Sequence, residues 1–429
     1  MKPAGRALVL VGATLLIALV WPYAPFWNAA LGLVAAVYVV DAMLGFRRPS
    51  PDVRRRIPPV LPVRSPQTVT LELFNPHAAA LRINVRDALP TTFNTTEAAA
   101  ELDLAPGERA VWEYEVQPTE RGPARFGQLH VQIASPLGLW WIQRVLGHSD
   151  DVRVYPDFRA ITQYLHLVAD QQSQRLGLRR TQRRGEGLEF QQLREFRDGD
   201  SIRQIDWKAT ARRRELISRE YAEERDQGVV FMLDTGGRMR AQDGALSHFD
   251  HALNALLLLA YVALRQGDVV SLQTFGPTHR WIGGLRGVTA INRLLNELYD
   301  LQSEAGAGDY TTAAETLMTK QRKRSLVVML TNLRQADSDL LPAVQLIRSR
   351  HAVLVASLRE RSVDEALKQE VATFDDALTV LGANRYQEQR RRLMARLATS
   401  AQLVRDCTPD ELPAELVNGY WSLKRAGVL

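Results

Sequence analysis

Residues 228–275 read GVVFMLDTGGRMRAQDGALSHFDHALNALLLLAYVALRQGDVVSLQTF, and this stretch indicates the fold of the longest domain of the chain. It begins with a short continuous apolar run, passes through a glycine-containing polar loop, and continues as a long apolar-faced helix before a second apolar run. Short Val- and Leu-rich strands that alternate with helices are typical of a parallel sheet covered on both faces. The stretch therefore predicts an α/β domain.

The same alternation continues toward the C-terminus. Further apolar strands are predicted at 324–332 and 352–358, and helices at 290–301 and 341–350. Two or three more helices are expected to finish the chain. We therefore predict a doubly wound α/β domain over residues 228–429.

Upstream of this domain the pattern has the period of a β-strand. Residues 51–156 contain six or seven short segments in which apolar and polar residues alternate, separated by Asn, Pro and Gly turn signals. This predicts an antiparallel sandwich of immunoglobulin-like size. Trp140 and Trp141 are interpreted as aromatics buried at the sandwich edge or in contact with a membrane face, although a binding surface is the alternative. Residues 157–227 form a basic linker and a charged segment.

The first 50 residues carry two apolar blocks, Ala7–Val20 and Ala29–Val40, around a proline- and aromatic-rich centre. They predict a hairpin of two transmembrane helices. Arginines follow the second block, among them Arg47, Arg48 and the run at 54–56, so the positive-inside rule places both ends in the cytoplasm. Asp41 is expected to reach the interface or to pair with Arg47 or Arg48, rather than to act inside the membrane. A cleaved signal peptide is the alternative reading.

Composition narrows the classes of function. The 429 residues include one cysteine, Cys407, and this excludes an internal disulfide framework and a cysteine-based zinc site. The net charge of +6 includes the arginines beside the apolar blocks, so it does not by itself indicate nucleic-acid binding. His248 and His251 have a spacing that can bind metal, but we interpret them as solvated surface residues.

The loop after the first α/β strand resembles that of von Willebrand factor A domains, in which D-x-S-x-S oxygens hold magnesium. This chain keeps Asp234 but has glycine and arginine at the serine positions, and an asparagine where a later aspartate is expected. The resemblance therefore implies a site that has lost its metal, in which Arg238 folds back toward Asp234 to supply the positive charge. Thr311 or Thr312 is the candidate threonine. The degenerate site comprises Asp234, Gly236, Arg238, Thr312 and Asn332.

A second signature begins GEG-x-x-F at Gly185 and continues LREFRDGD and then IDWKATAR. This order closely resembles the hallmark of the family called domain of unknown function 58 (DUF58), with Phe196 in place of a tyrosine. We interpret it as a charged network around a turn, with an aromatic lid, which is either a docking surface or a brace for the domain core. Its interaction residues are predicted to be Arg194, Glu195, Arg197, Asp200, Arg203, Asp206 and Trp207.

The resemblance implies a membrane-anchored protein with a von Willebrand factor A-like domain, encoded in many relatives beside MoxR-type AAA+ ATPases. We therefore expect a non-enzymatic adaptor in the inner (plasma) membrane, multi-pass, with the bulk of the chain cytoplasmic. Its expected partner is such an ATPase or its client, with no cofactor and no nucleic acid. The alternative is a hydrolase whose acidic groups come from Glu195, Asp200 and Asp206.

Overall fold

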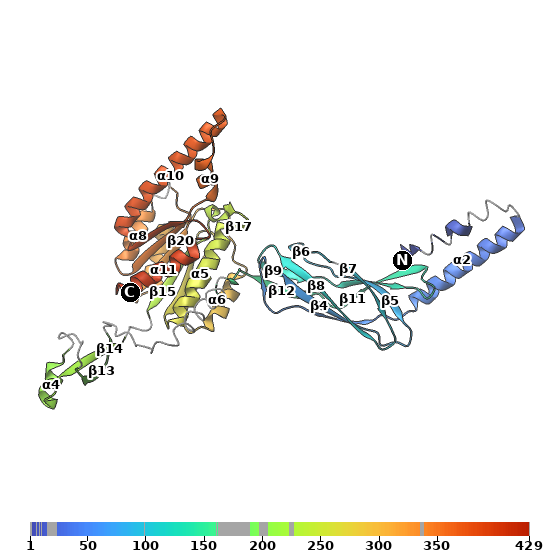
Figure 1. Ribbon diagram of the computed structural model, residues 1–429, viewed down its shortest axis with the longest axis horizontal. Helices are drawn as coiled ribbons and strands as arrows, with labels where there is room; N and C mark the ends of the chain where they lie inside the picture. Colours follow the sequence, from blue (N-terminus) through green and yellow to red (C-terminus); the bar gives the residue numbers. More distant parts are fainter. Residues whose placement is uncertain are drawn as a thin grey trace. The chain divides into compact units, whose positions relative to one another are not determined.

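The computed structural model describes residues 2–5, 7, 9, 11–14, 24–97, 99–159, 161, 189–196, 205–222, 227–334 and 339–428. Contacts between residues divide the chain into two units, Met1–Asp157 and Phe158–Leu429. Each unit is described by itself, and Figure 1 labels some of the elements of each.

The first unit contains a β-sandwich. One sheet has the strand order β1-β11-β10-β5-β7, a second has β2-β4-β8-β6, and a small third sheet has β3-β12-β9. Apolar side chains from all three sheets pack into one core. Along β8, for example, buried and exposed residues alternate, because one face of the strand points into this core. The bounds are β1 Lys2–Pro3, β2 Asp52–Arg56, β3 Leu61–Pro62, β4 Gln67–Phe74, β5 Leu81–Arg86, β6 Phe93–Thr95, β7 Ala99–Leu104, β8 Arg109–Pro118, β9 Gly122–Phe126, β10 Leu129–Ala134, β11 Trp140–Leu146 and β12 Asp150–Tyr155.

Arg55 lies inside this sandwich. Its guanidinium donates to Asp87 at 2.8 Å and to Asp150 at 2.9 Å, and its side chain is 3% exposed. Tyr114 also donates to Asp87. Burial raises the pKa of Asp87 despite these donors. The positive-inside argument counts Arg55 among the arginines that follow the apolar blocks, but strand alternation turns Arg55 inward while Arg54 and Arg56 face outward.

An apolar helix, α2 (Ala24–Phe46), precedes the sandwich strands β2–β12 in the chain. Its window Ala29–Phe46 is long and apolar enough to cross a membrane. A helix of 23 residues measures about 35 Å, against a hydrocarbon layer of about 30 Å. The turn between the two spans is predicted at residues 21–28, but residues 24–28 already belong to α2. Residues 15–23 lie outside the described residues, so the hairpin of two spans stays a prediction.

The C-terminal half of α2 is fixed to the sandwich through Asp41, whose side chain is fully buried. The carboxylate accepts hydrogen bonds from Ser135 Oγ and from the backbone N–H groups of Leu137 at 2.8 Å and Leu139 at 3.3 Å. Of the two expectations for Asp41, the pairing with Arg47 or Arg48 is wrong, because the loop between β10 and β11 supplies the donors. The expectation that Asp41 reaches the membrane interface stays a prediction.

Trp140 and Arg144 add to this contact from β11. Trp140 Nε1 donates to Tyr38 O at 3.1 Å, and the two rings meet edge to face at 5.7 Å between centroids. The Arg144 guanidinium donates to Phe46 O at 2.8 Å and to Arg48 O at 2.7 Å. Since the last carbonyls of a helix have no partner within it, this arginine satisfies the end of α2. Trp140 and Arg144 thus both hold β11 against the C-terminal half of α2.

The second unit contains an open six-stranded sheet of order β19-β18-β15-β20-β21-β22. All its neighbours pair in parallel except β19, which is antiparallel to β18. Every residue of β15, β20 and β21 is buried, as the continuous apolar runs predict. The bounds are β15 Gly228–Asp234, β18 Val269–Phe275, β19 Trp281–Leu285, β20 Ser325–Thr331, β21 Ala352–Leu358 and β22 Leu403–Cys407.

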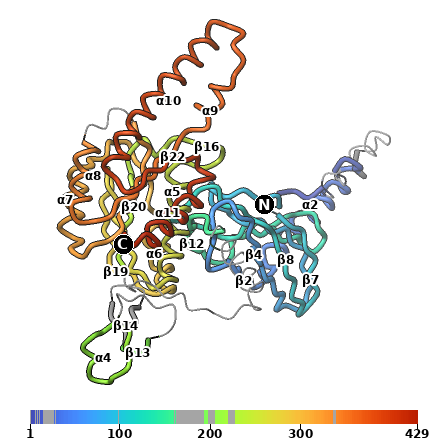
Figure 2. The backbone as a smooth tube through the Cα atoms, turned by 60° about the vertical axis from the view of Figure 1, so that its left-hand side comes forward, coloured from blue at the N-terminus to red at the C-terminus, as the bar shows by residue number. Residues whose placement is uncertain are grey.

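Helices cover both faces of this sheet. The core on one face includes α5, α6 and α11, and the core on the other includes α7, α8 and α10; Figure 2 shows α7 and α8 side by side. We had expected only helices at the C-terminus, but β22 forms an edge strand there whose residues are mostly half-buried. The bounds are η2 Gly237–Arg240, β16 Gln242–Asp243, β17 Leu246–Ser247, α5 His248–Arg265, α6 Ala290–Leu298, α7 Tyr310–Lys320, α8 Leu340–Arg348, α9 Arg361–Lys368, α10 Phe374–Ser400 and α11 Leu412–Arg425.

The hallmark segment forms a hairpin. β13 (Glu189–Glu195) pairs antiparallel with β14 (Ile217–Ala222), and the short helix α4 (Trp207–Arg213) lies in the connection. We call these three elements the hallmark hairpin. Residues 197–204 and 223–226 lie outside the described residues.

Candidate functional site

The carboxyl ends of β15 and β20 bring the predicted Asp234 site together. In the sheet, β15 lies between β18 and β20. The next strand of this sheet along the chain, β18, lies on one side of β15, and the later strands β20 to β22 lie on its other side. The strand order therefore reverses direction between β15 and β20. In open α/β sheets such a point is where functional groups gather. Asp234 is the last residue of β15, Thr331 is the last residue of β20, and Asn332 follows directly after β20.

Both oxygens of the Asp234 carboxylate are engaged, and its side chain is 1% exposed. Oδ1 accepts the N–H of Gly236 at 2.7 Å, and Oδ2 accepts the hydroxyl of Thr331 at 2.6 Å. Arg238 Nε lies 3.8 Å from Oδ2, so it acts on Asp234 as a nearby charge more than as a hydrogen-bond donor. The predicted approach of Arg238 to Asp234 is present, but the closer partners are Gly236 and Thr331.

Tyr310 links Arg238 to the same network. Its hydroxyl lies 2.8 Å from Thr331 Oγ1 and accepts from Arg238 Nη1 at 3.2 Å, and the guanidinium stands 5.7 Å from the Tyr310 ring centroid. Arg238 Nη1 also reaches Asn332 O at 3.4 Å. The cation therefore sits among a carboxylate, a hydroxyl, a carbonyl and an aromatic face.

The backbone closes the space where serine side chains would stand. A Cβ added at Gly236 would lie 2.9 Å from Asp234 Oδ1 and 3.0 Å from Gly306 O. The loop before α7 is pinned there, since Gly237 N donates to Gly306 O at 2.8 Å and Glu304 N donates to Thr235 O at 2.9 Å. A side chain at position 236 would have to push this loop away.

The other two members of the degenerate site are engaged elsewhere. Thr312 donates to Asp309 at 2.7 Å and belongs to the N-terminal cap of α7. The Asn332 amide donates to Glu360 at 2.7 Å, and its oxygen accepts from Arg390 at 3.3 Å. No group of three or more His, Cys, Asp or Glu suited to a metal occurs among the described residues. With Asp234 saturated and Arg238 beside it, the residues present do not fit the magnesium that D-x-S-x-S loops hold.

A second polar cluster lies at the carboxyl edge of the sheet and is centred on Arg390 of α10, which is 4% exposed. Its Nε and Nη2 donate to Asp406 at 3.0 Å and 2.8 Å. Burial disfavours the charge, but Asp406 holds the pKa of Arg390 above its ordinary value. The other acceptors of the guanidinium are Asn332 Oδ1, Ser357 Oγ and the carbonyl oxygens of Leu333 and Leu358. Arg390 thus joins α10 to β20, β21 and β22.

Glu360 and His248 complete this cluster. Burial acts to raise the pKa of Glu360, but the Asn332 hydrogen bond and the Arg390 charge hold it below its usual value. His248 is fully buried, its Nδ1 lies 3.3 Å from Asn332 Nδ2, and burial lowers its pKa. His248 Nε2 has no hydrogen-bond partner within the described part of the chain. We had interpreted His248 as a surface residue, which is wrong because the first turn of α5 packs inward.

Sequence reasoning missed the Arg390 cluster. Arg390 stands in the run Gln387–Arg392, QEQRRR, where several charges in a row are typical of a solvated helix face. Only the helical spacing distinguishes Arg390 from the exposed arginines beside it, because Arg390 lies on the same helical face as the buried residues Leu393 and Leu397. That spacing was the available signal.

Within the hallmark hairpin, four of the predicted interaction residues are described. Asp206 is the N-cap of α4 and accepts from Lys208 N at 3.0 Å and Ala209 N at 2.9 Å. Arg194 Nη1 donates to Glu195 O at 2.9 Å, and Glu195 is exposed on β13. Trp207 is 64% exposed, and its role as an aromatic lid stays a prediction because three members of the network that it would cover are not described. Arg197, Asp200 and Arg203 lie outside the described residues.

Comparisons with known proteins agree with the hallmark. Residues 192–403 match the family described as "Protein of unknown function DUF58", which supports the family indicated by the sequence. No curated protein matches the chain. One similar solved structure is the CARDB domain of a Pyrococcus furiosus protein in complex with di-metal ions, with 19% identity over 25% of this chain and 93% of that chain and a TM-score of 0.20. Another is Salmonella alpha-2-macroglobulin reacted with methylamine, with 15% identity over 24% of this chain and 7% of that chain and a TM-score of 0.20.

Proposed function

Starting from the match of residues 192–403 to the DUF58 family, we propose that the chain is a membrane-anchored, non-enzymatic adaptor for a cytoplasmic protein. The partner is a MoxR-type AAA+ ATPase or its client, as the resemblance to this family implies. The second unit is the von Willebrand factor A-like part of this adaptor. In its degenerate metal-ion site Arg238 supplies the positive charge next to Asp234, so partner binding does not depend on a divalent ion.

The anchor is α2 together with the apolar segment before it, which would complete a hairpin with both ends in the cytoplasm. Large apolar side chains are exposed along α2, including Leu33 at 69%, Val40 at 54% and Met43 at 62%. Such a surface is stable in lipid rather than in water. The contacts of Asp41 and Arg144 hold the sandwich at the end of the helix.

The observation that carries the adaptor role is the exposure of Trp207 on the hallmark hairpin. Asp206 caps α4 and so fixes the start of this helix, and Trp207 follows at its first position with 64% of its surface exposed. Lys208 and Arg212 of the same helix are also exposed. Exposed tryptophan beside cations is a common centre of protein–protein interfaces. The hairpin is therefore the proposed binding surface for the partner.

The test is an affinity pull-down of the full chain from detergent-solubilised membranes, with the ATPase quantified in each variant. Trp207→Ala should lower retention of the ATPase about 30-fold, since loss of a central tryptophan costs about 2 kcal/mol. Val111→Ala, which removes an exposed apolar side chain at 55% exposure on β8 of the sandwich, is the control and should retain it. Equal retention by both variants, or recovery of chaperones and lipid without an ATPase, contradicts the proposal.

A hydrolase remains the untested alternative. It needs Glu195, Asp200 and Asp206 to converge, and Asp200 lies outside the described residues. Asp206 is used by its own helix as a cap, and Glu195 lies on a strand of the hairpin. No observation favours this alternative over the adaptor.

A further inference from the structure

Helix α10 projects beyond the sheet with α9 beside it, as Figure 1 shows. The helix has 27 residues, and those that are buried lie at or after Arg390. Its free half begins at a capping box in which Thr373 and Asp376 each bond the backbone of the other. The projection therefore has a defined start, although few of its side chains are buried.

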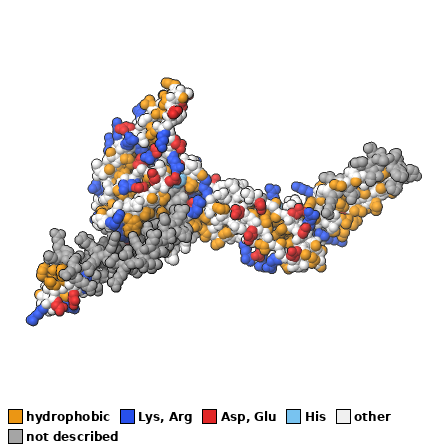
Figure 3. All heavy atoms as spheres, viewed as in Figure 1, with side chains coloured by type: hydrophobic (Ala, Val, Ile, Leu, Met, Phe, Trp, Pro, Cys, Tyr) orange, Lys and Arg blue, Asp and Glu red, His pale blue; other side chains and the backbone are white. Residues whose placement is uncertain are grey.

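Apolar side chains lie along one side of this free half. Phe374 is 76% exposed, Leu378 is 51% and Leu381 is 66%. The spacing of four and then three residues places them on one helical face. Figure 3 shows apolar side chains at the free end of the projection. A contiguous apolar face in water marks an interaction surface.

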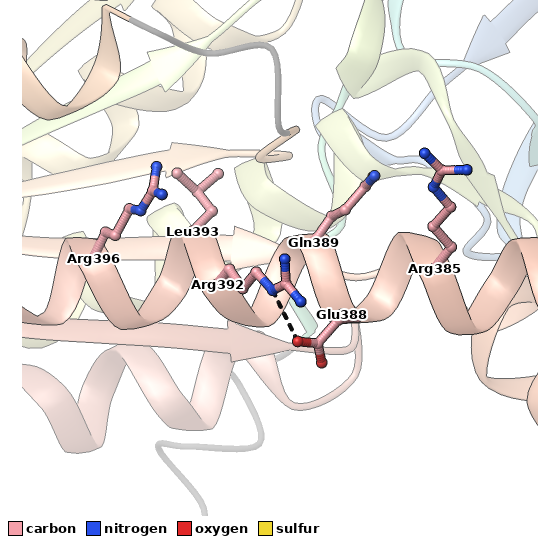
Figure 4. Close-up of a pocket in the computed structure, with 6 residues that line it drawn as sticks. All are labelled: Arg385, Glu388, Gln389, Arg392, Leu393 and Arg396. Carbon is pink, nitrogen blue, oxygen red and sulfur yellow. Dashed lines mark hydrogen bonds and ion pairs between the residues drawn. The ribbon is translucent and has the colours of Figure 1, made fainter.

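The same face continues as a row of arginines toward the sheet. Arg385, Arg392 and Arg396 follow at helical spacing. In Figure 4 Arg385 and Arg396 project to one side of α10, and Arg392 lies between them and reaches Glu388. With Glu388, Gln389 and Leu393 they line a groove of about 380 Å³. Arg392 pairs with Glu388 at 2.9 Å, and both side chains are more than half exposed. The α10 stripe, defined as Phe374, Leu378, Leu381, Arg385, Arg392 and Arg396, is thus apolar at one end and cationic at the other.

We propose that the α10 stripe binds an acidic amphipathic helix of a partner protein. Apolar side chains of that helix would cover Phe374, Leu378 and Leu381, and its carboxylates would pair with the arginines farther along. Charge complementarity selects this occupant, because the three arginines outnumber the one carboxylate on the same groove. The surface is separate from the hallmark hairpin and does not depend on the adaptor proposal.

Two other occupants fit less well. Asp375 and Asp376 stand in the first turn beside Phe374, so an anionic membrane would meet carboxylates at the apolar end. A second copy in parallel would place arginine against arginine. Three apolar side chains also bury far less than the roughly 800 Å² per partner of a stable interface, so the charged half is needed as well.

The experiment places a photo-crosslinking amino acid at Leu381 in the full-length chain in its native membrane and identifies the crosslinked peptide by mass spectrometry. The same group at Thr379, exposed on another side of the helix, is the control. We expect a peptide in which Asp and Glu outnumber Lys and Arg, with apolar residues at helical spacing. Arg392→Glu should lower the adduct yield about tenfold, because one exposed ion pair becomes a repulsion.

The outcomes separate this surface from the hallmark hairpin. Trp207→Ala should leave the Leu381 adduct unchanged, so loss of ATPase binding in that variant tests the adaptor alone. Adducts to lipid, to a second copy or to a peptide without excess acid overturn the proposal. A yield equal at Leu381 and Thr379, or absence of any adduct, also overturns it.

Discussion

Replacing Arg238 by methionine tests whether this residue supplies the charge that a metal would supply. The substitution keeps an apolar stem and removes the guanidinium 3.8 Å from Asp234 Oδ2. At an effective dielectric constant of about 20, the attraction at that distance is about 4 kcal/mol. Most of it is offset by the lost hydration of both groups, because the side chains are 15% and 1% exposed.

The net cost should be about 1–2 kcal/mol, because Asp234 keeps its bonds from Gly236 N at 2.7 Å and Thr331 Oγ at 2.6 Å. Amide hydrogen exchange of β15, measured on the full chain in detergent, reports this loss of stability at the strand itself. Exchange should become about 5–30-fold faster in Arg238→Met. Millimolar magnesium or manganese should not slow exchange in the native chain.

A second variant, Gly236→Ser with Arg238→Ser, restores the D-x-S-x-S pattern. It should still gain no stabilisation from metal, because a Cβ at position 236 meets Asp234 Oδ1 at 2.9 Å and Gly306 O at 3.0 Å. Two results refute this reasoning. One is unchanged exchange in Arg238→Met, and the other is slower exchange of the native chain with metal that Asp234→Ala abolishes.

Three further predictions concern buried polar groups. Arg390→Leu should destabilise the second unit by about 3–5 kcal/mol in denaturant unfolding, because Asp406 and buried carbonyl oxygens lose their hydrogen-bond donor. The control, Arg392→Leu, removes an exposed arginine and should cost under about 0.5 kcal/mol. Burial lowers the pKa of His248, so as the pH falls the unfolded chain binds a proton at this histidine before the folded chain does. The free energy of unfolding should therefore fall as the pH drops below about 6.5. His248→Gln should make the free energy of unfolding depend less on pH in that range. Asp41→Ala should speed amide exchange in the β10–β11 loop, costing about 1–3 kcal/mol, and Asp41→Asn should cost less because it keeps an acceptor.

The fold could be predicted largely from local patterns. Continuous apolar runs gave β15, β20 and β21, because burial on both faces leaves such runs in the sequence. β-period alternation predicted six or seven strands where the described part of residues 51–156 has eleven, β2–β12, because it marks only the longer strands with one buried face. The strand β22 was missed because its residues, LVRDC, are mostly half-buried at an edge and carry charge. The hairpin of two membrane spans and the residues 197–204 of the hallmark stay predictions.

Neighbouring residues alone were enough to predict the apolar helix, the two kinds of sheet, the hallmark and the missing serines after Asp234. Which charged side chains are buried could be learned only from the folded chain. Asp41 meets a loop 94 residues away, and Arg390 meets a carbonyl 57 residues away. A buried charge is stable only where distant backbone and side-chain groups converge on it, and that convergence leaves no local period in the chain.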